Sequence, residues 1–321
     1  MQLPVLVVLG TLVPTYLLGI YYFVRAWRTS RFTAITFLAC AAYGLAIESF
    51  ALRTTESYNY ADLWFMFGRS PNWVPYTIGI TWAMVIFIVM QTSDRLGVPW
   101  GMRPWLDGAL ATTLDLVIDP VSSASRWVQQ TGVSCMNDTS PLFGGFGVWT
   151  WCVPTGDRAL WFTIPLANFL GWFVVVAAIS FFIRAGRRWL GAEGWRALPQ
   201  VALALVMAGL SFATVKGVAG LYQHDRIGAS GQRLLLAALL LIPIVVLAAG
   251  WRRWNYRNPR DLGMLLMPAY AWIGGLGGFV WREIDRSSWP LSLIRLVALV
   301  LGGVALYLLP YAATLRRPKT S

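Results

Sequence analysis

Residues 105–127 read WLDGALATTLDLVIDPVSSASRW, a stretch apolar enough for a membrane helix that nevertheless carries three aspartates. A carboxylate deep in a bilayer costs several kcal/mol unless it faces protein, water or a partner, so such acids are functional candidates. Asp115 and Asp119 are four residues apart and stack on one face of a helix. Pro120 follows directly, and a proline inside a helix frees a backbone carbonyl and kinks the axis. The plainer alternative is a helix end or a polar loop.

The composition of the chain indicates a polytopic membrane protein. Of its 321 residues, 57% are hydrophobic and only 12% are charged, whereas soluble domains carry about 25% charged residues. No soluble-looking block exceeds a few dozen residues, so residues 1–321 are expected to form a single integral membrane domain. The net charge is +12, but the arginines cluster in short loops between apolar runs and form no contiguous basic face. A nucleic-acid partner is therefore not expected.

The apolar runs predict an all-α bundle of about nine transmembrane helices, within a range of seven to nine. Each run is long enough to cross a bilayer at roughly 20 residues per span. Most of the basic residues fall in alternate loops, which places the N-terminus outside and the C-terminus in the cytoplasm. On this topology, Arg184 and Arg187 belong to an inner loop. The expected spans are 3–24, 32–51, 74–91, 105–127, 160–183, 197–221, 234–251, 262–280 and 290–311.

The three cysteines divide into one expected packed thiol, Cys40, and a pair in one predicted outer loop. Cys135 and Cys152 both lie in the loop 128–159, which this topology exposes to an oxidising space where a disulfide can persist. A disulfide and two unpaired thiols remain equally open. The chain has one histidine and no C-x-x-C motif, so no metal site is expected.

Several polar side chains converge in depth. A helix rises about 1.5 Å per residue, so the position of a residue along its span gives its depth. On this measure Glu48, Asp119 and Asn168 lie at one level in the outer half of the membrane. Trp82 lies at the same level, and Asp115 lies near the midplane. This is the arrangement that a buried polar site requires.

Two readings of these acids remain open. In the structural reading they pair with Lys216, Arg126 or backbone groups and hold the bundle together. In the functional reading, an acid kept protonated in an apolar cavity donates its proton to a weak base such as an alkene. Aromatic faces and a second, ionised carboxylate then stabilise the carbocation, and water adds at the more substituted carbon.

The order and spacing of several sequence blocks resemble the carotenoid biosynthesis integral membrane family. This family contains carotenoid hydratases of the bisanhydrobacterioruberin and gamma-carotene type. The resemblance covers roughly residues 40–185. It departs from the family at residues 57–60, where SYNY replaces a glycine-rich Phe-Gly-x-Tyr motif. The blocks are Ile47-Glu48-Ser49, Tyr58-Asn59-Tyr60 with Trp73-Val74-Pro75, Asp115-Leu116-Val117-Ile118-Asp119-Pro120, Trp149-Thr150-Trp151 and Pro165-Leu166-Ala167-Asn168-Phe169-Leu170-Gly171-Trp172.

The resemblance implies hydration of a terminal isoprenoid double bond of a carotenoid, giving a tertiary alcohol, without a cofactor or metal. It implies an integral protein of a bacterial or archaeal cytoplasmic membrane. Its partners would be a carotenoid within the bilayer, membrane lipids and other carotenoid-pathway enzymes. The implied acid and base candidates are Glu48, Asp115 and Asp119, with Asn168 positioning water. The implied substrate-binding residues are Tyr60, Trp82, Trp151 and Trp172.

Other functions use some of the same residues. A membrane prenyltransferase holds magnesium and a diphosphate with aspartates often spaced Asp-x-x-x-Asp, and Asp115 and Asp119 match one such pair. The chain lacks a second aspartate-rich motif. A transporter would relay protons through buried acids, but no inverted repeat is visible in the sequence. A non-catalytic carotenoid-binding protein is the remaining alternative.

Overall fold

The structure, a computed structural model, confirms the all-α class in the part of the chain that it describes. Seven α-helices there are 17 residues or longer, and the strands are two to four residues long. The described residues are 10, 12–55, 58–60, 65–69, 72–124, 149–151, 160–161, 164–250, 262–271 and 273.

The helices follow the apolar runs of the sequence. The α-helices are α2 (Val13–Thr29), α3 (Arg31–Thr55), α4 (Tyr76–Arg95), α5 (Arg103–Ala124), α6 (Leu166–Leu190), α7 (Ala197–Val218) and α8 (His224–Gly250). The short 3-10 helices are η2 (Trp100–Met102), η4 (Ala192–Gly194), η5 (Ala219–Tyr222) and η6 (Leu262–Leu265).

Five helical segments in the described residues are long and apolar enough to cross a membrane, which indicates an integral membrane protein. These segments are Arg31–Arg53, Tyr76–Arg95, Leu166–Leu190, Ala197–Tyr222 and Asp225–Val246. The predicted span 290–311 lies outside the described residues, and only part of 262–280 lies within them. The prediction of nine spans therefore stays a prediction.

Two predicted spans begin at the wrong residue. The span expected at 160–183 begins as α6 only at Leu166, because Ile164 and Pro165 pair as a short strand with the two residues from Leu160. The span expected at 234–251 begins earlier, at His224. The polar residues before 234 form a helical turn that kinks at Gly228, whose φ of 63° is in the left-handed region open to glycine.

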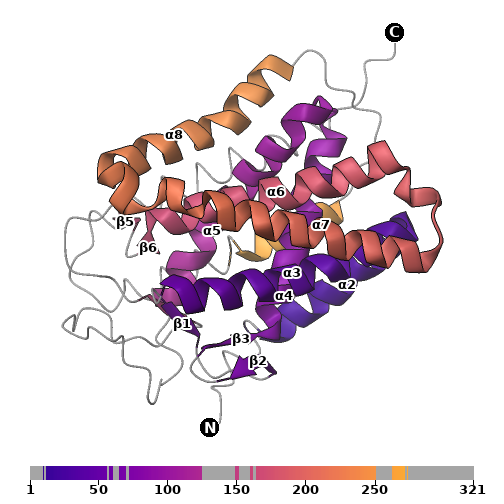
Figure 1. Cartoon of the computed structure of the whole chain (residues 1–321), viewed down its shortest axis with the longest axis horizontal. Coiled ribbons are helices and arrows are strands. Elements are labelled where there is room, and N and C mark those ends of the chain that lie inside the picture. The colour runs from indigo at the N-terminus through magenta and orange to yellow at the C-terminus, as the bar shows by residue number, and fades with distance from the viewer. Residues whose placement is uncertain are drawn as a thin grey trace.

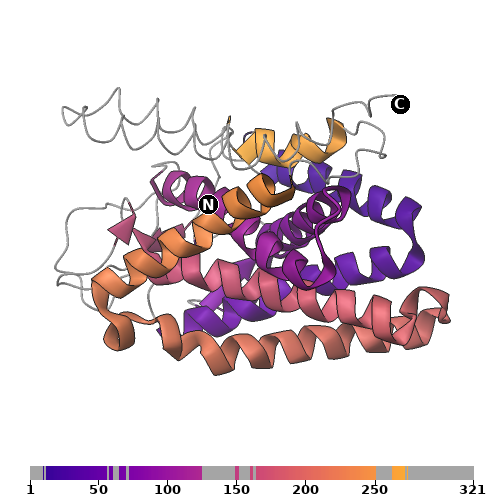
Figure 2. The same cartoon turned by 90° about the horizontal axis from the view of Figure 1, so that it is seen from above.

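The helix α5, which carries the aspartates, lies at the centre of the bundle (Figure 1). It packs against α4, α6 and α8, and α8 crosses it in the second view (Figure 2). From Leu106 to Val117 every residue of α5 is buried. Because neighbouring helices cover it on all sides, α5 can keep polar groups that a lipid-facing helix could not.

Close helix contacts depend on glycines at two positions. A Cβ atom on Gly79 would lie 2.7 Å from the backbone oxygen of Ala41, where α4 crosses α3. A Cβ atom on Gly108 would lie 2.7 Å from the backbone oxygen of Phe173, where α5 crosses α6. Small residues at such crossings allow helix backbones to approach closely, which brings α3, α4, α5 and α6 together around one site.

Three short antiparallel strand pairs, absent from the sequence-based prediction, lie at the ends of these helices. The pairs are β1 (Tyr58–Tyr60) with β4 (Trp149–Trp151), β2 (Met66–Arg69) with β3 (Asn72–Pro75), and β5 (Leu160–Trp161) with β6 (Ile164–Pro165). Segments this short show little periodicity of their own, and each depends on its partner for backbone hydrogen bonds. The first pair joins segments that are about ninety residues apart in the sequence.

Candidate functional site: a buried carboxyl cluster

Glu48 is buried on α3 and accepts hydrogen bonds from three side chains. The phenols of Tyr58 and Tyr60 both donate to Oε2, the second over 2.8 Å. The indole Nε1 of Trp82 on α4 donates to Oε1 over 2.9 Å. All three partners are neutral donors, so both oxygens of Glu48 act as acceptors, as an ionised carboxylate requires.

The strand pair β1–β4 covers this end of the site with aromatic rings. Tyr58 and Tyr60 are two residues apart in a strand and so point to the same side. Trp151 stands opposite Tyr58 and Trp149 opposite Tyr60. The ring centroids are 4.6 Å apart in the first pair and 5.8 Å apart in the second. The pairing between distant segments thus places two phenols on Glu48 and two indoles beside those phenols.

Both phenols remain hydrogen-bond donors over a wide pH range. Burial, together with the adjacent negative charge of Glu48, raises the pKa of Tyr58 and of Tyr60 well above the usual value of a tyrosine. Ionisation of either phenol would place a second charge beside the carboxylate in a region shielded from water. The site therefore keeps its two O–H donors at neutral and moderately alkaline pH.

Asp115 and Asp119 share one donor from the neighbouring helix α6. The Asn168 Nδ2 atom donates to Oδ2 of Asp115 over 2.9 Å and to Oδ2 of Asp119 over 2.5 Å. Both aspartates are buried. The second oxygen of Asp115, Oδ1, is shielded from solvent and has no hydrogen-bond partner among the described residues. The sequence prediction that these two aspartates occupy one helix face is confirmed.

The helix α5 continues past Pro120, and a tryptophan accounts for the bond that the proline removes. Proline lacks the N–H that would bond to the carbonyl of Leu116, four residues earlier. The indole Nε1 of Trp161 in β5 donates to this carbonyl oxygen over 3.2 Å. Asp119 can therefore stand immediately before a proline without leaving that backbone acceptor unsatisfied.

A cavity joins Glu48 to Asp119. The space in it that the centres of water molecules can occupy is about 30 Å³. This is enough for about two water molecules, since one needs roughly 10–15 Å³. The rings of Trp82 and Trp172 stack in its wall, with centroids 4.0 Å apart. The lining residues are Glu48, Tyr58, Tyr60, Ile78, Thr81, Trp82, Ile118, Asp119, Trp149, Trp151, Asn168 and Trp172.

The cavity brings together the residues predicted from the sequence. Every predicted site residue other than the two cysteines lines it, except Asp115, which is joined to it through Asn168. Two residues given no role from the sequence, Tyr58 and Trp149, also line it. The alternation in Tyr-Asn-Tyr and Trp-Thr-Trp was the available signal, because it directs both outer residues of each triplet to one side. Cys135 and Cys152 lie outside the described residues.

Trp82 reaches Glu48 because α3 has a glycine opposite it. A Cβ atom on Gly44 would lie 2.5 Å from the Cβ atom of Trp82 and 2.6 Å from its Cγ atom. Real Cβ atoms do not approach a side chain so closely, so only glycine leaves room for the indole in this position. Gly44 thus positions the donor of one of the three hydrogen bonds to Glu48.

The third aspartate of α5 belongs to a separate ionic cluster. Oδ2 of Asp107 lies 2.8 Å from Nη2 of Arg184 on α6 and accepts from Ser180 over 2.5 Å. Arg184 also pairs with Asp94, which lies 2.6 Å from Nη1 of Arg103. The prediction that Arg184 and Arg187 lie in a loop is wrong, because α6 continues to Leu190 and contains both. The helix carries the Arg184 side chain inward, and its buried charge is retained because two carboxylates neutralise it.

Among the described residues, no arginine or lysine lines the Glu48–Asp119 cavity. Lys216 on α7 lies 6.0 Å from the ring centroid of Phe50, and no salt bridge in the described part of the chain joins it to the three acids. Arg126 lies outside the described residues. Within those residues, no three His, Cys, Asp or Glu side chains are grouped so that they could hold a metal ion.

Comparison with known proteins assigns neither a family nor a function to this chain. No protein family model matches this chain, and no curated protein or solved structure matches it. A function must therefore be inferred from the chemistry of the cavity and from the resemblance of its sequence motifs.

Proposed function

We propose that this chain is a membrane-embedded hydratase that adds water to a terminal isoprenoid double bond of a carotenoid and forms a tertiary alcohol. The observation that carries the proposal is the convergence of Glu48, Asp115 and Asp119 on one buried cavity walled by tryptophans. The substrate class comes from the motif resemblance. The location fits such a substrate, since a carotenoid dissolves in the bilayer that these helices cross.

The aspartate pair is the proton donor in this proposal. Two carboxylates that share one donor, with no cation lining the cavity, are stable in a buried site when they hold one proton between them. Asp119 lines the cavity and can reach a substrate. Asp115 lies behind it with one oxygen unpartnered among the described residues, so it can take up the charge when Asp119 gives its proton away.

Glu48 is the fixed anion. Three donated hydrogen bonds favour its ionised form, and in this proposal Glu48 stays a carboxylate while the aspartates exchange the proton. Its negative charge lies across the cavity from the aspartates and can stabilise a cation formed between them. Developing charge is stabilised most strongly when the surrounding groups are already oriented, and the β1–β4 pair and Trp82 orient this one.

The proposed reaction balances without a cofactor. Asp119 gives its proton to the less substituted alkene carbon, and the double bond becomes a tertiary carbocation. The indole faces of Trp82 and Trp172 and the charge of Glu48 stabilise this cation. A cavity water attacks the cationic carbon, and its released proton returns to the ionised aspartate pair. Asn168 keeps the two aspartates aligned throughout.

Prenyl transfer is the second candidate, favoured by the spacing of Asp115 and Asp119. It would need a metal-bound diphosphate, whose charge is usually balanced by basic side chains. The described part of the cavity lining contains no basic side chain, which favours a neutral substrate. An assay with prenyl diphosphate and magnesium separates this activity from hydration.

The first test is expression in bacterial hosts that produce lycopene, gamma-carotene or a C50 carotenoid. Pigments are then separated by chromatography with mass detection. A product heavier by one water is expected with the native chain and not with Asp119→Asn. Asp225→Asn is the matched control, because Asp225 is an exposed acid in the first turn of α8. Unchanged pigments in all three hosts, with folded protein in the membrane, would overturn the proposal.

A further inference from the structure

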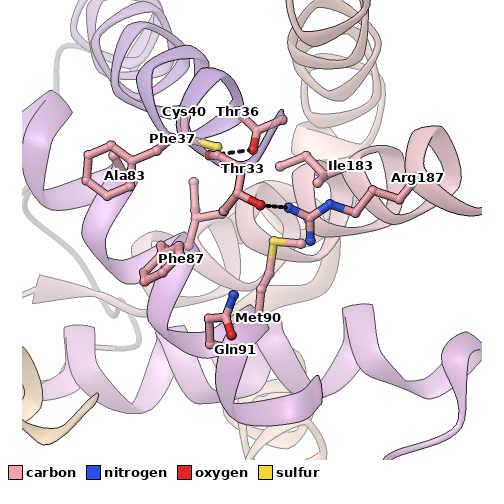
Figure 3. A pocket seen from close by; sticks show the side chains of 11 residues that line it. Thr33, Thr36, Phe37, Cys40, Ala83, Phe87, Met90, Gln91, Ile183 and Arg187 are labelled. Carbon is pink, nitrogen blue, oxygen red and sulfur yellow. Dashed lines mark hydrogen bonds between the residues drawn. The ribbon is translucent and has the colours of Figure 1, made fainter. Parts of the chain in front are cut away.

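A second cavity lies between α3, α4 and α6, at the end of the bundle opposite the carboxyl cluster (Figure 3). It lies near the start of α3 and near the last turns of α4 and α6. The basic loops predict that this end faces the cytoplasm. The lining residues are Thr33, Thr36, Phe37, Cys40, Ala83, Ile86, Phe87, Met90, Gln91, Ile183 and Arg187.

The cavity has an apolar interior and a polar mouth. Only Gln91 and Arg187 among its lining residues are partly exposed, and the others are buried. The empty space between the lining atoms is about 300 Å³, including the part open to the outside. The space that the centres of water molecules can occupy is about 20 Å³. A ligand with a polar group would therefore place that group at the mouth, beside Arg187.

The guanidinium of Arg187 is only partly satisfied. Its Nη2 atom donates to Thr33 over 2.9 Å, which Figure 3 shows as a dashed line. Its Nε atom is shielded from solvent and makes no hydrogen bond in the described part of the chain. The nearest carboxylate oxygen, Oε1 of Glu193, is 3.3 Å from Nε. An arginine carries five N–H donors, and among the described residues Arg187 makes one hydrogen bond, to Thr33, and one ion pair, with Glu193.

Arg184, one turn earlier on the same helix, shows what a saturated arginine looks like in this protein. Its Nε atom donates to Asp107 and Ser180, and its Nη1 atom to Asp94. Its Nη2 atom reaches Met90, Ser93 and Asp107. Both arginines lie near the end of α6, but Arg184 has several hydrogen-bond acceptors around it, whereas Arg187 bonds to one within the described residues. Arg187 can therefore donate hydrogen bonds to an acceptor that the described contacts do not supply.

We propose that this cavity binds a phosphate-bearing anion at Arg187. A guanidinium matches the geometry of phosphate oxygens and can donate two parallel hydrogen bonds to them. The partly exposed amide of Gln91 lies at the same mouth. Beyond the mouth the lining is apolar, with Phe37 and Phe87, so the charged group of a ligand would stay at the mouth. The phosphate comes either from the headgroup of a membrane lipid or from a soluble phosphate compound.

The test uses the purified full-length protein in neutral detergent. Thermal unfolding is measured against phosphatidylglycerol, with phosphatidylcholine as the zwitterionic lipid of no net charge, and against inorganic phosphate and pyrophosphate at constant ionic strength. A saturable rise in unfolding temperature is expected with one anionic class. Saturation with phosphatidylglycerol alone identifies a lipid headgroup, and saturation with phosphate or pyrophosphate alone identifies a soluble ligand. No saturable effect in either arm overturns the proposal.

Three variants predict the direction in which the binding affinity should change. Arg187→Gln should weaken binding about tenfold or more, since bonds to a charged group are lost. Glu193→Gln should tighten it, because this exposed carboxylate competes for the guanidinium. Arg188→Gln is the matched control, since Arg188 lies over the Trp100 ring and outside the cavity lining. If Arg187→Gln fails to fold, Glu193→Gln still decides. Unchanged binding in Glu193→Gln, or equal losses in Arg187→Gln and Arg188→Gln, contradicts a specific site.

Discussion

The helix α5 carries two kinds of buried aspartate, and the difference between them separates structural from candidate functional acids. Asp107 is fully buried and paired with Arg184. Asp115, two turns further along, is equally buried but has an amide partner and, in the part of the chain that the structure describes, no cationic one. An acid neutralised by a buried arginine is held in one ionisation state and holds helices together. An acid without such a partner, beside a cavity, can exchange a proton.

The largest effect is expected from Asp119→Asn, which keeps the shape of the side chain and removes its acidity. Loss of a general acid lowers turnover by a factor of about 10²–10⁴, and the thermal unfolding temperature should change little. Pigment analysis and thermal unfolding on the same preparation measure both quantities. Full activity in this variant would contradict the assignment of the Asp115–Asp119 pair, rather than Asp107, to the reaction.

The converse is expected for Asp107→Asn. Removing one partner of a buried ion pair leaves the other charge uncompensated and costs about 3–5 kcal/mol. The free energy of unfolding should fall by that order, while the protein that remains folded keeps its specific activity. Chemical denaturation in detergent, with Asp225→Asn as the exposed control, measures the change. A stable but inactive Asp107→Asn protein would assign this cluster to the reaction.

A smaller effect is expected from Gly44→Ala, which acts on the carboxyl cluster through Trp82. The added methyl group would lie 2.6 Å from the Cγ atom of the Trp82 indole, and overpacking of this kind costs about 1–3 kcal/mol. The hydrogen bond from Trp82 to Glu48 should lengthen, and turnover should fall with the fold retained. Gly209→Ala on α7 is the matched control, since no atom lies within 4 Å of its added Cβ. Equal losses in the two variants would contradict a specific role for Gly44.

The smallest effect concerns alkaline pH. Because the pKa values of Tyr58 and Tyr60 are raised in the folded protein, both should stay neutral as exposed tyrosines ionise near about pH 10. Their contribution to stability is complete below that pH and is lost as pH rises toward the folded-state pKa. Absorbance at the tyrosinate band should show a late-ionising component.

The matched variant for this titration is the double change Tyr58→Phe with Tyr60→Phe, which should reduce the late component. Unfolding in denaturant should abolish it, because all tyrosines then ionise near the usual pH. A folded protein in which every tyrosine ionises near about pH 10 would contradict the burial of these phenols.

Several features of the candidate site could be predicted from the sequence because they depend on one helix at a time. The face shared by Asp115 and Asp119 follows from the helical period. The common depth of Glu48, Asp119 and Asn168 follows from the rise per residue, and the cavity contains all three. The freed carbonyl near Pro120 follows from proline chemistry, although its donor, Trp161, had no signal in the sequence.

Membrane class, helical architecture and the positions of the acids along their helices were determined by the sequence itself, since hydropathy and backbone hydrogen bonding act locally. Tertiary structure alone decided which acid meets a cation. The rotation of α5 about its axis cannot be read from hydropathy, because neighbouring helices bury it on every side. Packing against α6 pairs Asp107 with Arg184 and places Asn168 as the hydrogen-bond donor to Asp115. The pairing of β1 with β4 likewise brings Tyr58 to Glu48 and Trp149 into the cavity wall. Neither segment is long enough to predict this pairing by itself.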